Sequence, residues 1–153
     1  MGGAPDSEGR FMVAVGAVIE HEATGTILLV KRAETADYFP GIWEDAMGRM
    51  KQFEEPEDAL RREVREETGL AIEILQPLAV VHDFRGARTA ENEWVGVIYW
   101  ARAPSQDVVL SEEHTAYMWV APERALEIVE HAGVRADIEA LIAARAGRPG
   151  GAA

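Results

Sequence analysis

The stretch from residue 48 to residue 70 constrains the fold most, because it holds the strongest helix signal in the chain. Pro56 suits the first position of a helix, where its missing N–H group has no intrahelical partner. Gly69 suits the left-handed conformation that commonly ends a helix. Apolar residues one turn apart lie between these limits, so one side of the helix can face a core. We therefore predict a helix over residues 57–68.

Acidic side chains crowd this helix and the residues before it. Residues 54–67 hold seven acidic and three basic side chains. Glu63, Glu66 and Glu67 share one face of a helix, because positions i, i+3 and i+4 do so, and like charges at that spacing repel each other. Glu54 can fold back towards the same face. Either this is a solvated acidic face, or the carboxylates hold a hard cation, for which Mg²⁺ or Mn²⁺ is the natural choice.

The spacing of the residues in this stretch decides between the two interpretations. Nine defined positions, separated by fixed intervals, are occupied by Gly48, Glu54, Arg62, Glu63, Val64, Glu66, Glu67, Gly69 and Leu70. With ordinary residue usage, a chance match at one start point is on the order of one in a billion. This spacing is the Nudix box, so the chain resembles the Nudix hydrolases.

The resemblance implies both a metal site and a fold. The residues implied at a site for Mg²⁺ (or Mn²⁺) are Glu63, Glu67, Glu66, Glu54 and Gly48. Among them, Glu63 and Glu67 are the central ligands, Glu66 assists, and Glu54 either supports the ligands from behind or is an alternative ligand. The fold implied is the Nudix-type α/β/α sandwich with a central mixed sheet. The alternation of strand and helix patterns by itself predicts an α/β sandwich with helices on both sides of a mixed sheet.

Catalysis in the resembled family needs a base near the metal. Two candidates remain open here, Glu66 in the box and Glu113 in a polar loop before a short strand; a loop acid without a role is the alternative for Glu113. By resemblance, Arg62 orients a catalytic glutamate. Arg32 follows a strand and is a candidate for binding phosphate or a solvated residue. Trp43 is either a packing residue or a substrate-stacking one.

The remaining elements follow from periodicity and turn residues. We predict strands over residues 11–19, 26–31, 71–83, 94–103 and 117–120, and further helices over residues 122–131 and 134–145. The first two strands are expected to form a hairpin. Pro77 marks an edge or a bulge in its strand. Irregular segments are expected over residues 33–47, 85–93 and 104–115. Residues 11–147 are expected to form a single domain, between a disordered leader at 1–10 and a disordered tail at 148–153.

Two local features qualify these expectations. The box glycine is commonly preceded by Pro-Gly in the family, whereas this chain has Ala46 and Met47, which puts the local loop conformation in question. The histidines show no metal-ligand spacing, and we expect surface or supporting positions for all four: His21, His82, His114 and His131.

Composition limits the classes of partner that the chain can bind. The net charge of −12 argues against nucleic-acid polymers and anionic membranes, which both call for basic patches. A bound divalent cation still allows a nucleotide to bind. No apolar run is long enough to span a membrane, and the absence of cysteine excludes a cysteine nucleophile and disulfides. We expect a small nucleotide as the partner and a cytoplasmic location, and leave a homodimer open.

The resemblance predicts an Mg²⁺-dependent hydrolase that cleaves the diphosphate bond of a nucleoside diphosphate linked to another group. Sequence marks for several other substrates are missing after the box, which favours nucleoside triphosphates, including oxidised ones of the 8-oxo-dGTP type. The alternatives are other nucleotide derivatives such as ADP-ribose or nucleotide sugars, and a nucleotide-sensing protein without catalysis. An isoprenoid diphosphate isomerase would need a catalytic cysteine.

Overall fold

A mixed seven-stranded sheet forms the centre of the protein, whose computed structural model describes residues 8–148. The strands are β1 (Met12–His21), β2 (Ile27–Arg32), β3 (Trp43–Glu44), β4 (Ala46–Arg49), β5 (Glu73–Phe84), β6 (Glu93–Ala103) and β7 (His114–Val120). The helices are α1 (Pro56–Thr68), α2 (Pro122–Ile128) and α3 (Ala132–Ala146), with a 3-10 turn at Ala90–Asn92. The predicted leader at 1–10 and tail at 148–153 lie almost wholly outside the described residues.

Strand β1 is the organising strand of the sheet. It pairs in parallel with β6 along its whole length, and β5 extends the sheet beyond β6 in antiparallel fashion. On its other edge, β1 pairs with β4 over residues 14–17 and with β2 only at Glu20. Strands β3 and β7 both pair with β2. Because β1 lies between two neighbours and is covered on both faces, seven of its ten residues are buried, as its continuous apolar sequence predicts.

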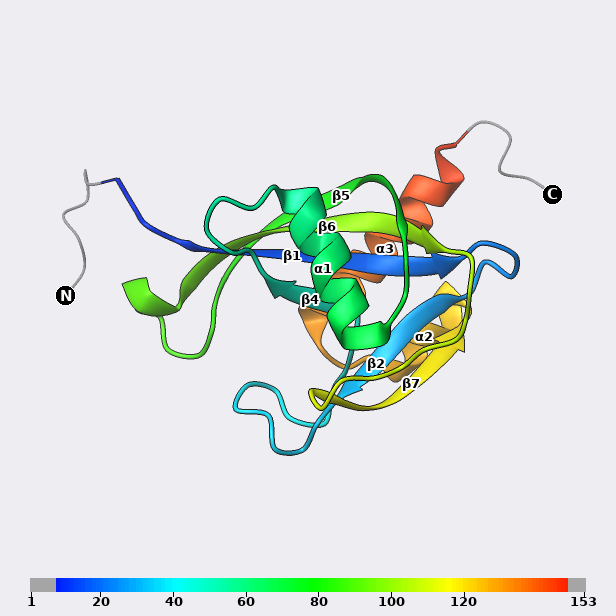
Figure 1. Cartoon of the computed structure of the whole chain (residues 1–153), viewed down its shortest axis with the longest axis horizontal. Helices are drawn as coiled ribbons and strands as arrows, with labels where there is room; N and C mark the ends of the chain where they lie inside the picture. Colours follow the sequence, from blue (N-terminus) through cyan, green and yellow to red (C-terminus); the bar gives the residue numbers. More distant parts are fainter. Residues whose placement is uncertain (1–7, 149–153) are drawn as a thin grey trace.

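Helix α1 covers one face of the sheet (Figure 1). Val15, Ala17 and Ile19 of β1 point to this face and pack in one cluster with Leu60 and Val64 of α1. The period of two along the strand meets the one-turn spacing along the helix. All five side chains are almost completely removed from solvent, so this contact fixes the helix that carries the acidic residues.

Helices α2 and α3 cover the opposite face (Figure 1). Here Val18 of β1 and Trp100 of β6 pack with Val134, Ile138 and Leu141 of α3. The predicted α/β sandwich with helices on both sides of a mixed sheet is therefore confirmed. No helix in residues 8–148 is both long and apolar enough to cross a membrane.

The predicted first helix is confirmed with its ends. Pro56 occupies the start of α1, and Gly69 caps the end with φ of 72° while its N–H donates to the carbonyl oxygen of Arg65. That left-handed conformation suits glycine because a Cβ atom would be strained there.

Three local predictions need correction. The segment over residues 33–47 is not irregular throughout, since β3 lies within it and β4 begins in it. Pairing with β1 and β2 creates these short strands, and local sequence does not reveal such long-range partners. The helix predicted over residues 122–131 ends at Ile128, so that α3 can begin at Ala132. The expected hairpin between β1 and β2 is reduced to one residue pair, because β4 takes the rest of that edge. Pro77 does adjoin a bulge in the edge strand β5.

Candidate active site

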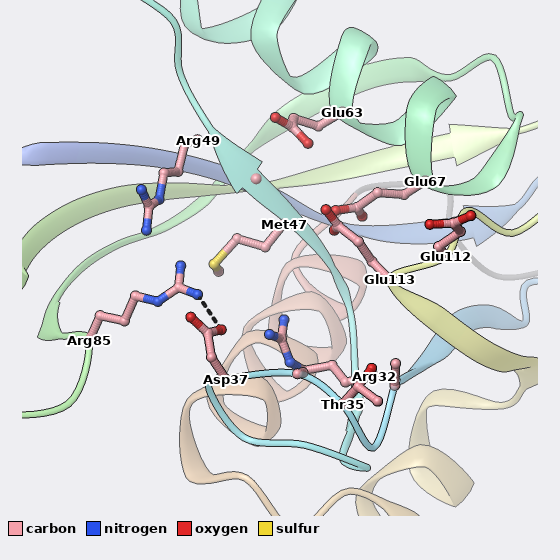
Figure 2. A pocket seen from close by; sticks show the side chains of 13 residues that line it. Arg32, Thr35, Asp37, Met47, Arg49, Glu63, Glu67, Arg85, Glu112 and Glu113 are labelled. Carbon is pink, nitrogen blue, oxygen red and sulfur yellow. Dashed lines mark hydrogen bonds and ion pairs between the residues drawn. The ribbon is translucent and has the colours of Figure 1, made fainter.

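A cleft of about 510 Å³ lies between α1, β4 and the loops that follow β2, β5 and β6. Figure 2 shows the glutamates of its lining gathered towards α1, and Asp37 lying with the arginines on the opposite side. The charged residues that matter for its chemistry are Glu63, Glu67, Glu113, Arg32, Arg49 and Arg85. Sequence analysis singled out four of these six, all but Arg49 and Arg85.

Glu67 is the most constrained acidic residue in the cleft. Its residue is only 4 % exposed, and its Oε2 atom is buried without a hydrogen-bond partner. Burial, together with the neighbouring carboxylates of Glu113 and Glu63, raises the pKa of its carboxyl group to about 9. Figure 2 shows the side chains of Glu67 and Glu113 pointing towards one another from different elements. A carboxyl group buried beside other carboxylates favours the charged form only when a cation joins it.

Position 48 requires a glycine because the Glu63 side chain occupies the space where a Cβ atom would lie. A Cβ atom at Gly48 would lie 2.1 Å from the Cδ atom of Glu63, which is far inside contact distance. Gly48 sits in β4, paired with Val15 of β1. The absence of a side chain on β4 therefore makes room for the Glu63 carboxylate at the edge of the cleft.

Arg62 binds several of the box carboxylates at once. Its Nε and Nη2 atoms donate to the two carboxylate oxygens of Glu54 at 2.6 and 2.9 Å. Its Nη1 atom donates to Glu63 at 2.8 Å and to Glu66 at 3.3 Å, and Nη2 also reaches the carbonyl oxygen of Arg49. These bonds from Arg62 lower the pKa of Glu54 to about 2. Glu54 is thus engaged by Arg62 and helps to hold it in place.

Glu66 does not share the cleft with the other two helix glutamates. Its side chain is 56 % exposed, against 16 % for Glu63, and it does not line the cavity. The face predicted for Glu63, Glu66 and Glu67 is split, because Glu67 turns towards the sheet while Glu66 turns towards solvent. Within residues 8–148, no three acidic or histidine side chains lie close enough together to hold a metal ion as they are oriented.

Glu113 reaches the cleft because its loop is anchored at both sides. The Ser111 N–H donates to the carbonyl oxygen of Glu67 at 3.1 Å, and the Ala33 N–H donates to that of Glu113 at 2.9 Å. The predicted irregular segment over residues 104–115 is therefore tied to the end of α1 and to the end of β2. This places a residue 46 positions beyond Glu67 in the sequence beside it in space.

Arg32 lies at the end of β2 and lines the cleft, as its position after a strand allows. Its Nε atom donates to the carbonyl oxygen of Tyr38 at 2.8 Å, and Nη1 pairs with Glu44 at 3.3 Å. Glu44 also bonds the Nε2 atom of His114 at 3.0 Å. His114 is buried, so the surface alternative considered for it is wrong and the supporting one holds.

The comparison with known proteins agrees with this geometry. The family described as NUDIX domain matches residues 10–142. The chain belongs to the Nudix family. Two curated Nudix relatives come from Escherichia coli. The "CTP pyrophosphohydrolase" of strain K12 is 30% identical over 140 residues, covering 92% of this chain and 98% of the relative. The "Nucleoside triphosphatase NudI" of strain ED1a is 35% identical over 106 residues, covering 65% and 75%.

A solved structure supports the fold assignment. The MutT protein from Methanosarcina mazei Go1 matches with a TM-score of 0.74 at 24% identity, covering 93% of this chain and 99% of that one. The Nudix fold is thereby confirmed, and membership of the family identifies the chain as a hydrolase of acid anhydrides.

Nudix hydrolases generally use divalent metal ions, and the donors in this cleft fit such an ion. The available groups are carboxylate oxygens, which hard cations prefer. The buried Oε2 atom of Glu67 has no partner in the described residues, and cation binding would supply one. Glu63 and Glu113 are among the further acidic residues of the same cavity, which Asp37 and Glu112 also line.

A second, more apolar cavity of about 390 Å³ adjoins the Nudix cleft. Both cavities share Arg32 and Met47, so these two side chains lie at their boundary. Aromatic rings line the second cavity: Tyr38, Phe39, His82, Trp94 and His131. Ala46 and Met47, which stand in place of the usual Pro-Gly before the box, thus take defined positions. Ala46 is buried within β4, and Met47 separates two cavities.

Two buried carboxyl groups, Asp45 and Asp137, line this second cavity. Burial raises the pKa of Asp45 well above its usual value, and the neighbouring charge of Asp137 acts in the same direction. Burial also raises the pKa of Asp137, to about 6. The protonated form is therefore favoured at both carboxyl groups, and most strongly at Asp45.

Trp43 does not reach the Nudix cleft. It lies in β3 and packs against the cluster formed by the sheet and α3, and it lines neither of the two adjoining cavities. Of its two predicted roles, the packing one matches this position.

Sequence reasoning missed Asp45, Asp137, Arg49 and Arg85. Only Asp137 had a usable signal, because it interrupts the apolar stripe of α3 one turn after Val134. The other three become relevant through contacts between distant segments.

The buried pair predicts a specific dependence of stability on pH. An ordinary Asp ionises near pH 3.9 in the unfolded chain, whereas in the native protein burial raises the pKa of Asp45 well above its usual value and that of Asp137 to about 6. The free energy of unfolding should therefore fall as pH rises from 4 to 7, by about 1.4 kcal/mol per unit for one retained proton. Asp45→Asn should reduce this slope by about that amount. Urea titrations at several pH values measure it.

Glu67 also has a raised pKa. Its effect on the pH dependence of stability is the same in wild type and in Asp45→Asn, so it cancels when the two profiles are compared. Parallel stability profiles for wild type and Asp45→Asn would contradict the raised pKa of Asp45.

Proposed function

We propose that the chain is an Mg²⁺-dependent pyrophosphohydrolase of nucleoside triphosphates. The observation that carries the proposal is the buried, unpartnered Glu67 carboxyl group in a cleft with carboxylates on one side and arginines on the other. The adjoining apolar cavity offers a place for a base next to a place for phosphates. Two E. coli relatives are named for activity on nucleoside triphosphates.

Glu67 and Glu63 are proposed to hold the cation, with Mn²⁺ as the substitute ion. A bound divalent cation supplies charge neutralisation at phosphate oxygens. Gly48 leaves space for the Glu63 carboxylate. Arg62, held by Glu54, donates to Glu63 from the neighbouring position and limits its orientations. Arg62 and Glu54 are thus proposed to position a ligand rather than to bind the ion.

Glu113 is proposed as the base that takes a proton from the attacking water. It lines the cleft, whereas Glu66 does not, and a base must lie within hydrogen-bond reach of the proton it removes. Its loop is fixed to α1 through the bond between Ser111 and Glu67. Arg32, at the boundary of the two cavities, is proposed to contact the phosphate nearest the sugar.

A substrate screen tests the proposed function. Wild type and Glu67→Gln are assayed with Mg²⁺ on the common ribo- and deoxyribonucleoside triphosphates, 8-oxo-dGTP, ADP-ribose and UDP-glucose, measuring phosphate and pyrophosphate release. A nucleoside triphosphate should show the highest kcat/KM. Glu67→Gln should lose at least about two orders of magnitude, as expected when electrostatic stabilisation of the transition state is removed.

A clear preference for ADP-ribose or UDP-glucose would contradict the substrate class. No hydrolysis of any compound by the folded wild type would favour the sensing alternative. Full activity of Glu67→Gln would remove the proposed metal ligand.

The choice of base has its own test. Glu113→Gln should lower kcat by about 10²–10⁴-fold, the usual contribution of a general base, while Glu66→Gln should stay within about tenfold because its carboxylate points to solvent. Asp107→Asn, in the same loop but outside the cleft, is the matched control. The three variants are compared by steady-state kinetics on the best substrate. A Glu113→Gln enzyme within threefold of wild type would return the role to Glu66.

A further inference from the structure

Arg85 reaches the cleft from a part of the chain that is far from the box. It lies in the loop between β5 and β6, and its side chain is 33 % exposed. It lines the cavity that contains Glu63 and Glu67. Figure 2 shows the guanidinium groups of Arg85 and Arg49 on the side of the cavity opposite these two glutamates.

The partner of Arg85 is an exposed acid on another loop. The Nη2 atom of Arg85 lies 2.8 Å from the Oδ1 atom of Asp37, whose side chain is 81 % exposed. Arg85 also lies over the Tyr38 ring at 5.5 Å from its centroid, and the Tyr38 hydroxyl group donates to the carbonyl oxygen of Phe84. An ion pair with such an exposed partner is weak, because water and salt screen it.

The other arginines of the cleft differ in how strongly they are held. Arg32 is committed to the Tyr38 carbonyl oxygen and to Glu44. Within residues 8–148, the side chain of Arg49 has no hydrogen-bond partner, and that of Arg85 has only Asp37. Arg85 can therefore exchange its partner at little cost.

We propose that Arg85 binds the polyphosphate of the substrate, and that Asp37 is a counter-ion which the polyphosphate displaces. This inference rests on the proposed function. A polyphosphate bound by a cation on the α1 side leaves anionic oxygens on its other side, where Arg85 and Arg49 lie. Arginine suits this task, since its planar group can donate two parallel hydrogen bonds to a phosphate.

The directions in which removal of Arg85 and removal of Asp37 change phosphate binding distinguish a phosphate-binding role of Arg85 from a purely structural one. If the Asp37–Arg85 pair only ties two loops together, removing either partner breaks the same contact and changes binding in the same direction. If Asp37 competes with phosphate for Arg85, removing Asp37 strengthens phosphate binding and removing Arg85 weakens it.

Inorganic tripolyphosphate is the probe, because it has no base and its binding does not depend on which nucleotide is hydrolysed. Its affinity in Mg²⁺ is measured by calorimetry on the full chain. Arg85→Gln should weaken binding at least about tenfold, as for loss of a charge-assisted pair of hydrogen bonds. Asp37→Asn should tighten it about threefold, the scale of an exposed ion pair.

Two controls match the change in net charge. Arg88→Gln removes a cation of the loop that carries Arg85; Arg88 packs over Phe84 outside the cleft. Glu91→Gln removes an acidic side chain from the same connection between β5 and β6. Both should stay within about twofold, since exposed charges at a distance are screened. With the best nucleotide, Arg85→Gln should raise KM more than it lowers kcat.

Three results would overturn the proposal: a shift in the same direction for Arg85→Gln and Asp37→Asn, an Arg85→Gln affinity within twofold of wild type, or no binding of tripolyphosphate by wild type. A wild type that hydrolyses nucleotides while Arg85→Gln behaves normally would leave the proposed function standing and reject only the role of Arg85.

Discussion

The burial of the Glu67 carboxyl group beside two other acidic side chains is the constraint on which the active site depends. Transfer of a charge from water into a protein costs several kcal/mol unless a counter-charge accompanies it. Helix α1 can keep Glu67 buried because Leu60 and Val64 anchor the same helix in the core. The energy of a well-packed helix thus offsets the unfavourable position of one functional carboxyl group, which becomes favourable when a cation binds.

The surrounding charged side chains lower the cost of burying acidic groups in the site, but they do not remove it for Glu67. Arg62 donates hydrogen bonds to Glu54, Glu63 and Glu66 and so balances their negative charge, but it does not reach Glu67. Arg32 is the only cation among the groups that influence the pKa of Glu67 in the described residues, and its effect is the smallest. The structure therefore neutralises the residues that position the site and leaves the proposed central ligand available.

Much of this arrangement could be predicted from the sequence, because local patterns encode it. The limits of α1 follow from Pro56 and Gly69, and the box spacing identifies Glu63 and Glu67. What could not be predicted depends on contacts between distant segments. Strand β4 exists through its pairing with β1, and the split between Glu66 and Glu67 depends on where the sheet lies relative to the helix. The second cavity and the Asp45–Asp137 pair require the packing of α3 against the sheet.

Mn²⁺ located by anomalous diffraction in crystals of the wild-type protein tests the central claim most directly. The account predicts an ion coordinated by a carboxylate oxygen of Glu67, with Glu63 as a further ligand. An ion bound instead by the exposed acids of α1, such as Glu57 and Asp58, with no ion near Glu67, would contradict it.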